Sequence, residues 1–349
     1  MTSPSHHRPE GGFRNPWPGA APRGFRDFLR WILFDRRSRA RSDRPDHSAF
    51  ARTAPSFATP RASRKTLTVT RVGHSTFLVQ LGALNVLTDP VWSERASPIP
   101  FLGPRRRVAP GVAFDALPPI DLVLISHSHY DHLDDRTVRR LIAAHPEAHW
   151  LAPLGVAEFL TRRGAAQVTE RDWWEETRVG DARIACVPAQ HFSGRGLGDR
   201  NETLWCGWMV DAHDWTMCFA GDTGLHPEFR AVGERYGRAD VALLPIGAYD
   251  PRWFMRPVHM DPEEAVQAFI ELNGSTGRVE PGRVMVPTHW GTFKLTDESL
   301  DEPPKRVRTA WERAGLADDD LWVLRVGETR AVRSDPVDPH RRLSRPHGM

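Results

Sequence analysis

The sequence predicts an α/β protein, and two observations support this prediction. Short apolar runs of strand length recur along the 349 residues. Between them lie segments whose apolar residues are spaced by three and four positions, as in amphipathic helices. Strands that alternate with helices are typical of the α/β class. Because the motifs described below span most of the chain, we expect one folded domain over residues 66–333 with a tail at each end.

The expected elements follow in chain order. Strands are predicted over residues 68–72, 76–81, 121–125, 183–191, 216–222 and 284–289. Helices are predicted over residues 136–144, 156–163, 228–236, 263–272 and 305–314. Asp134 and Asp135 are expected to cap the start of the first of these helices.

A histidine-rich loop follows the apolar run 121–125. Three imidazoles and one carboxylate stand within six positions, at His127, His129, Asp131 and His132. His127 and His129 alternate and can reach one ion, whereas Asp131 and His132 are adjacent and can serve a second. A solvated turn is the alternative interpretation, but four such groups in a strand-to-helix loop favour a metal site with two sub-sites.

The ligand types restrict the kind of metal site. A closed structural zinc site usually contains thiolates in paired spacing, yet Cys186, Cys206 and Cys218 form no C-x-x-C pair. Imidazoles mixed with carboxylates fit zinc, iron or manganese with an open coordination position. The sequence therefore predicts a site that is capable of catalysis.

Four more residues each follow a strand-like run: His74, His191, Asp222 and His289. Taken singly, each could be an ordinary structural residue at a strand end. Together they predict one sheet edge at which several strand ends present ligands, as rigid scaffolds usually do.

Four motifs follow one another between about Thr66 and about Val326: His-x-His-x-Asp-His, a lone His, Gly-Asp-Thr-Gly and a late Thr-His-Trp-Gly. In this order they resemble the motifs of the metallo-β-lactamase-fold hydrolases. Within that superfamily the chain most resembles the N-acyl-phosphatidylethanolamine-hydrolysing phospholipase D group. The segments that carry this likeness are residues 73–77, 87–90, 204–208, 244–255, 261–266 and 289–293. The resemblance implies a four-layer αββα sandwich, with metals in a cleft at one edge of the two sheets and residues 66–333 as the catalytic domain.

The resemblance also implies a mechanism with two zinc ions, although iron or manganese would tolerate the same ligands. The first ion would be held by His127, His129 and His191, the second by Asp131, His132 and His289, with Asp222 as a bridge. Metal-bound water has a pKa near ~7, so hydroxide is available to attack phosphorus. Asp131 and Asp222 are the expected catalytic carboxylates, with Asp131 orienting the hydroxide. The expected products are phosphatidate and an N-acylethanolamine.

Six further residues receive roles. Placed by the resemblance, the expected substrate-binding residues of the cleft wall are Tyr130, Tyr249, Trp253 and His259. A capped helix start before Asp261 is the alternative for His259. His74 and Asp89 are expected to orient ligand imidazoles by hydrogen bonds, the alternative being ordinary strand-end hydrogen bonding.

The charge is concentrated in the first 65 residues. Residues 1–65 carry 14 Lys and Arg and 5 Asp and Glu, a net charge of +9, so the rest of the chain is net −6. This distribution makes nucleic acid an unlikely partner, because phosphate-backbone binding requires a basic footprint around the cleft. We expect residues 1–65 to form a basic, largely disordered arm and residues 334–349 a flexible tail.

Residues 24–37 of the arm predict a short amphipathic helix with basic flanks. It either docks on anionic lipid or covers apolar surface on the body. The helix is too short to cross a bilayer, and no secretory signal is visible. We therefore expect a cytoplasmic protein, with peripheral contact to the inner membrane face and a homodimer as further hypotheses.

Three alternative functions stay open. A lactonase of the sugar-phosphate type shares the Gly-His-Ser opening and Thr-Asp-Pro, although the segment 244–255 argues against it. A nuclease is disfavoured by the acidic body. A non-catalytic lipid-sensing module would be marked by degenerate ligands, and none of the seven expected ligands is degenerate. Fold alone does not identify the substrate.

Overall fold

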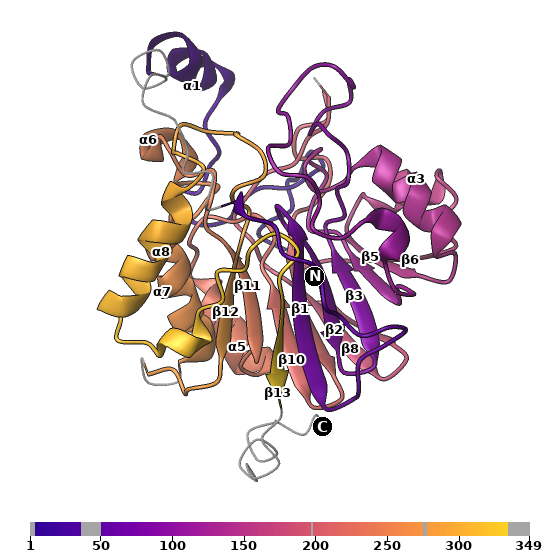
Figure 1. Ribbon diagram of the computed structural model, residues 1–349. Coiled ribbons are helices and arrows are strands. Elements are labelled where there is room, and N and C mark those ends of the chain that lie inside the picture. Colours follow the sequence, from indigo (N-terminus) through magenta and orange to yellow (C-terminus); the bar gives the residue numbers. More distant parts are fainter. Residues whose placement is uncertain (1–3, 36–49, 197, 275–277, 334–349) are drawn as a thin grey trace.

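The computed structural model describes residues 4–35, 50–196, 198–274 and 278–333 (Figure 1). Within them, a seven-stranded sheet has the order β13-β1-β2-β3-β4-β5-β6, and a six-stranded sheet has the order β12-β11-β10-β9-β8-β7. The first sheet consists of β1 (Thr66–Gly73), β2 (Thr76–Leu81), β3 (Leu84–Thr88), β4 (Leu122–Leu124), β5 (His149–Pro153), β6 (Gln167–Arg171) and β13 (Thr329–Arg333). The second consists of β7 (Glu176–Val179), β8 (Ala182–Val187), β9 (Gly207–Ala212), β10 (Trp215–Phe219), β11 (Val241–Pro245) and β12 (Val284–Thr288).

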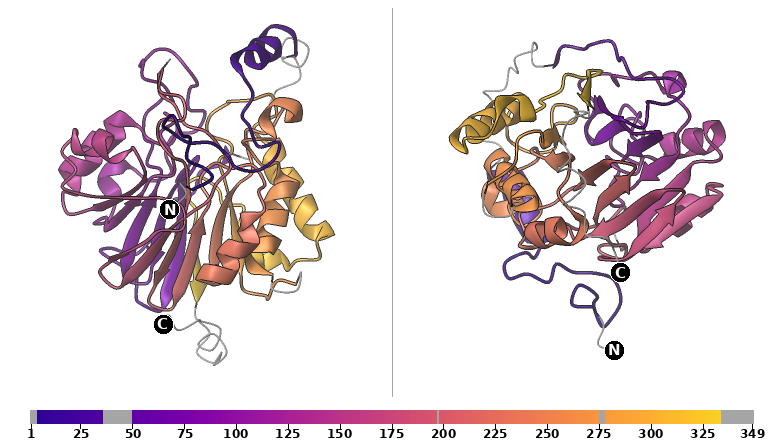
Figure 2. Two further views of the ribbon diagram at one scale, coloured as in Figure 1. Left: turned by 180° about the vertical axis from the view of Figure 1, so that it is seen from behind. Right: turned by 90° about the horizontal axis from the view of Figure 1, so that it is seen from below.

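Helices cover the outer face of each sheet (Figures 1 and 2). The α-helices are α1 (Phe25–Arg30), α3 (Asp135–Ala144), α4 (Ala157–Thr161), α5 (Glu228–Tyr236), α6 (Arg252–Met255), α7 (Pro262–Asn273) and α8 (Glu302–Arg313). A π-helical turn, η1 (Trp31–Asp35), continues α1, and short 3₁₀ turns are η3 (Phe114–Ala116) and η4 (Asp318–Asp320). Helix α3 lies beside the first sheet, whereas α5, α7 and α8 lie beside the second.

Three apolar layers join these elements. Trp208, Trp215 and Phe77 are fully buried between the two sheets. Phe269 of α7 packs 5.1 Å from Trp311 of α8 in the layer outside the second sheet, and α3 and α4 contribute to the layer outside the first. The four-layer αββα sandwich expected from the sequence is therefore confirmed.

Strand direction brings the loops that carry the expected ligands to one edge. Strands β3 to β6 run parallel, as do β10 to β12. Strands β1 and β3 both pair antiparallel with β2, so they run in the same direction. Strands β8 and β10 likewise both pair antiparallel with β9. The carboxyl ends of β1 and β8 therefore lie at the same edge as those of the parallel strands. The loops that follow β1, β3, β4, β8, β10 and β12 therefore meet there.

The N-terminal arm differs from the expectation of a largely disordered segment. Residues 4–35 and 50–65 contact the body, and Phe13, Ala20 and Trp31 of the arm are buried. Aromatic side chains explain this packing, because they bury large apolar area. The expected helix 24–37 corresponds to α1 and η1. Arg36, Arg37 and the expected C-terminal tail, 334–349, lie outside the described residues.

The helices of the described part of the chain include none that is both long enough and apolar enough to cross a membrane.

Candidate metal centre

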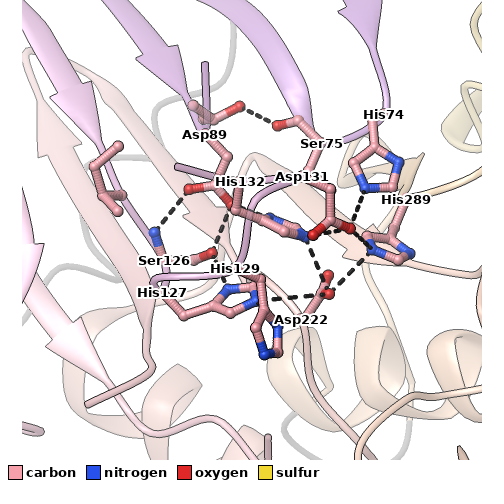
Figure 3. Close-up of polar contacts among 12 residues, drawn as sticks. His74, Ser75, Asp89, Ser126, His127, His129, Asp131, His132, Asp222 and His289 are labelled. Carbon is pink, nitrogen blue, oxygen red and sulfur yellow. Dashed lines mark hydrogen bonds and ion pairs between the residues drawn. The ribbon is translucent and has the colours of Figure 1, made fainter. Parts of the chain in front are cut away.

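Two groups of ligand side chains meet where the strand ends converge (Figure 3). In the first group, His129 Nδ1 lies 2.8 Å from His127 Nε2 and 3.3 Å from His191 Nε2. Three imidazole nitrogens from the β4 and β8 loops therefore face a common point. These are the three residues that the sequence assigned to the first ion.

The second group combines imidazoles with a carboxylate. Asp131 Oδ2 lies 3.5 Å from both His132 Nε2 and His289 Nε2, and 3.0 Å from His74 Nε2. His289 comes from the end of β12 and His74 from the β1–β2 turn. The structure thus brings together the residues that the sequence assigned to the second ion and places His74 against Asp131.

Asp222, after β10, lies between the two groups. In the second group, its Oδ2 is 3.1 Å from His132 Nε2 and 3.0 Å from His289 Nε2. In the first group, the same oxygen is 4.0 Å from His127 Nε2 and 3.9 Å from His191 Nε2. One carboxylate oxygen therefore faces both groups, which is the position of a bridging ligand.

Burial sets the protonation of the first group. It lowers the pKa of His129 to about 4 and that of His191 to about 3, and it holds the pKa of His127 well below the usual value. These imidazoles are therefore neutral near pH 7, which is the form that binds a metal.

In the second group, carboxylates and imidazoles hold one another in their charged forms. Burial opposes ionisation of Asp131 and Asp222, but the neighbouring imidazoles hold the pKa of both carboxyls well below the usual range. Burial likewise acts to lower the pKa of His289, yet Asp222 and Asp131 raise it to about 9. Ionised carboxylates in a buried pocket favour a cation as partner.

The residues fit divalent cations. Asp222 Oδ1 is buried and has no hydrogen-bond partner in the described structure, whereas His132 Nε2 and His289 Nε2 have only their ion-pair contacts with Asp131 and Asp222. Unpaired buried polar atoms are rare in native proteins unless an ion or water satisfies them. Because nitrogen and carboxylate donors converge here, the donor set fits zinc, iron or manganese.

A second layer of contacts orients the ligands. Asp89 Oδ2 lies 2.6 Å from His132 Nδ1, and Asp89 also accepts hydrogen bonds from the amide and hydroxyl of Ser126. Ser126 Oγ lies 2.9 Å from His127 Nδ1, and the Val258 carbonyl oxygen lies 2.8 Å from His191 Nδ1. Such partners fix the orientation of ligand imidazoles. Ser126 and Val258 were not identified from the sequence, although the position of Ser126 next to His127 was a usable signal.

A cleft of about 470 Å³ leads to both groups. Its apolar lining includes Phe25, Phe28, Trp31, Phe192, Phe254, Met255 and Leu295. Three of these residues belong to α1 and η1, so the N-terminal arm forms part of the cleft wall. This role was not predicted from the sequence, because the arm and the ligands are joined only by the tertiary fold.

The expected cleft-wall residues are placed differently from one another. His259 lines the cleft, and its ring centroid lies 4.9 Å from that of His191. Helix α7 is capped by Asp261 and not by His259.

Two other expected cleft-wall residues lie elsewhere. Tyr249 is buried, and its hydroxyl donates a hydrogen bond to Glu302. Trp253 lines a separate pocket beside the arm, under the Arg30 guanidinium, while its neighbour Phe254 lines the cleft that leads to the ligand groups.

Tyr130 also lies outside the residues that line the cleft. Its hydroxyl donates to the Arg195 carbonyl, and its ring lies 4.0 Å from the Arg195 guanidinium carbon. Arg195 in turn donates to the carbonyls of Ser128 and Leu133. Tyr130 and Arg195 therefore support the histidine loop from outside.

Comparison with known proteins agrees with this architecture. Residues 84–290 match the family model described as a β-lactamase superfamily domain, so the chain belongs to that superfamily and is a metal-dependent hydrolase with the metallo-β-lactamase fold. The structure of Igni18, a metallo hydrolase from Ignicoccus hospitalis, has a TM-score of 0.57 and 26% identity, covering 77% of this chain and 100% of that one.

Two curated relatives extend over most of the chain. An uncharacterised protein of Mycobacterium tuberculosis is 40% identical over 87% of this chain and 79% of its own length. N-acyl-phosphatidylethanolamine-hydrolysing phospholipase D 1 of Caenorhabditis elegans is 37% identical over 76% of this chain and 76% of its own length. The resemblance to this phospholipase D group is therefore confirmed.

Proposed function

We propose that the chain is a zinc-dependent phosphodiesterase of phospholipase D type that acts on lipids like N-acyl-phosphatidylethanolamine. The position of Asp222 Oδ2 between two ligand groups carries this proposal, because it suits a pair of ions bridged by one carboxylate. Two neighbouring ions can stabilise both the attacking and the leaving oxygen of a displacement at phosphorus. The C. elegans relative supports the substrate class.

The side chains have distinct tasks in this reaction. When bound, the ions would supply a water of lowered pKa and neutralise charge on the phosphate oxygens. Asp131, held by His74 at 3.0 Å, belongs to the second group and would orient the attacking water. Phe192, Phe254 and the other apolar residues of the cleft would hold acyl chains and exclude bulk water.

The surface around the cleft mouth supports a lipid substrate. On α1 and η1, Phe25 and Phe34 are 69% and 72% exposed, and Phe101, on the β3–β4 connection, is 82% exposed. Both segments project from the same end of the molecule (Figure 1). Exposed apolar side chains beside Arg26 and Arg30 suit peripheral contact with an anionic membrane. Substituting Phe34 and Phe101 by Ser should reduce sedimentation with phosphatidylserine vesicles and leave hydrolysis of a small diester unchanged, because neither residue lines the cleft.

Product analysis by mass spectrometry tests the proposed reaction. The zinc-loaded protein is incubated with mixed micelles of N-acylated and ordinary phospholipids, with a lactone, and with a chromogenic diester; Asp222→Asn serves as the blank. We expect phosphatidate that depends on active protein. Turnover of the diester alone would remove the lipid assignment but keep the phosphodiesterase. Lactone opening alone would replace the proposal by a lactonase.

A further inference from the structure

A second cluster of metal-binding side chains lies where the N-terminal arm meets the body. His6 Nε2 is 2.6 Å from Asp172 Oδ1, and His7 Nε2 is 2.7 Å from Asp172 Oδ2. The two imidazoles come from the arm and the carboxylate from the turn after β6, so 166 positions separate His6 from its partner. Two nitrogens and a carboxylate thus meet at one point, with all ligand atoms within 4.8 Å of one another.

Packing holds these rings in place independently of the carboxylate. His6 is buried and stacks on Trp173, with 4.2 Å between ring centroids and 22° between planes. His7 meets Phe13 edge to face at 5.0 Å. The Trp173 amide donates to Asp172 Oδ1 at 2.7 Å, which orients the carboxylate as well. All three ligands are therefore preorganised, as a metal site requires.

The chemistry of the cluster fits a divalent cation of the zinc type. Imidazole and carboxylate are both ligands of zinc, with bonds of about 2.0–2.2 Å. The ligand atoms of a tetrahedral zinc ion lie roughly 3.3 Å apart. Binding of zinc would therefore move the Nε2 atom of each ring away from its Asp172 oxygen by roughly 0.6 Å. Burial opposes ionisation of Asp172, but hydrogen bonds from His6, His7 and the Trp173 amide lower its pKa. The carboxylate is therefore ionised, as a ligand must be.

We propose that His6, His7 and Asp172 form a divalent-metal site, separate from the catalytic cleft, that clips the N-terminal arm to the body. His7 is 28% exposed, so solvent can complete the coordination. Downstream of the clip, the Asn15 side-chain amide donates to the His191 carbonyl at 2.8 Å, and the arm continues to α1 at the cleft mouth (Figure 2, left). The clip thus holds the segment that supports one catalytic ligand and part of the cleft wall.

The His7→Gln variant distinguishes a metal site from hydrogen bonds that hold the arm without a metal. Glutamine can still donate a hydrogen bond to Asp172 but is a poor zinc ligand. His145→Gln, at the end of α3 and outside every ligand cluster in the described structure, is the matched control. After dialysis against buffered zinc, elemental analysis should find one zinc fewer per chain in His7→Gln than in the wild type and in the control. Equal zinc contents would overturn the proposal.

Proteolysis supplies a second readout. The rate of tryptic cleavage after Arg8 and Arg14, followed by mass spectrometry, reports opening of the arm. At a zinc concentration ten times the dissociation constant of the clip, cleavage in the wild type should slow by about tenfold relative to His7→Gln. Because both proteins keep the catalytic ligands, the difference isolates the clip. Equal protection by zinc in the two proteins would mean that zinc acts at another site, and the proposal would be overturned.

Discussion

The catalytic centre and the cluster of His6, His7 and Asp172 contain the same kinds of side chain but orient them differently. In the centre, the expected ligands follow strand ends, and His127, His132 and His191 each have a polar partner on the second ring nitrogen. At the arm, His6 and His7 lie in irregular chain and are oriented by the rings of Trp173 and Phe13. A sheet edge and an aromatic stack can therefore each preorganise imidazoles, but only the sheet edge combines several strands into a deep cleft.

The largest effect on activity is expected from Asp222→Asn. The change removes the charge that faces both ligand groups, so turnover should fall by more than the roughly 10–100-fold that loss of a supporting residue costs. Rates on lipid and on a small diester measure this, with metal content and thermal melting recorded in parallel. Asp181→Asn, in the exposed β7–β8 turn, is the matched control. Wild-type rates at full metal content would exclude a bridging role.

Asp89→Asn should have a smaller effect, because Asp89 acts through another residue. It lies 2.6 Å from His132 Nδ1 and is fully buried. A loss of roughly 10–100-fold in metal affinity or activity is expected. Competition with a chromophoric chelator measures the affinity directly, and an unchanged affinity would make Asp89 an ordinary strand-end residue.

The neighbours Phe254 and Trp253 test which side of α6 faces the substrate. Phe254 lines the metal cleft, whereas Trp253 lies on the arm side. Phe254→Ala should lower kcat/KM for long-chain lipid by about tenfold, which corresponds to about 1.4 kcal/mol, and leave the small diester nearly unaffected. Trp253→Ala serves as the matched control, with little change on either substrate. The reverse result would exchange the two roles.

The last effect is expected on stability, not on activity, and concerns a buried imidazole outside the ligand groups. His226 stacks between Trp17 of the arm and Phe229, and burial lowers its pKa to about 3. The unfolded state, with a pKa of about 6.5, binds the proton more readily. The neutral imidazole therefore stabilises the fold above pH 6.5, and this contribution is lost as the pH falls from 6.5 toward 3, by about 1.4 kcal/mol per pH unit.

Urea unfolding at several pH values measures this contribution. His226→Phe keeps an aromatic ring between Trp17 and Phe229 but has no proton to bind. The free energy of unfolding of the variant should fall less steeply than that of the wild type below pH 6.5. Parallel slopes would show that His226 does not titrate in this range.

Much of the metal centre could be predicted because its signals are local. The expected strands 284–289 and 216–222 overlap β12 and β10, and the residues that close them, His289 and Asp222, reach the ligand groups. A strand end followed by a ligand is visible within a few residues, and parallel neighbours place such ends at one edge. The cleft wall carries no comparable signal. Trp253 and Phe254 are adjacent aromatic residues, and only the packing of α6 decides which one lines the cleft.

The sequence by itself determined the α/β class and the residues that gather around Asp222, because strand periodicity and the spacing of ligands after strands are properties of short segments; the αββα arrangement followed from the family resemblance. Only the tertiary structure decided that the arm packs on the body, that α1 lines the cleft, and that His6 and His7 meet Asp172. These contacts join segments far apart in the chain. Their free energy comes from burying apolar surface between those segments, and no local pattern records which partner will cover it.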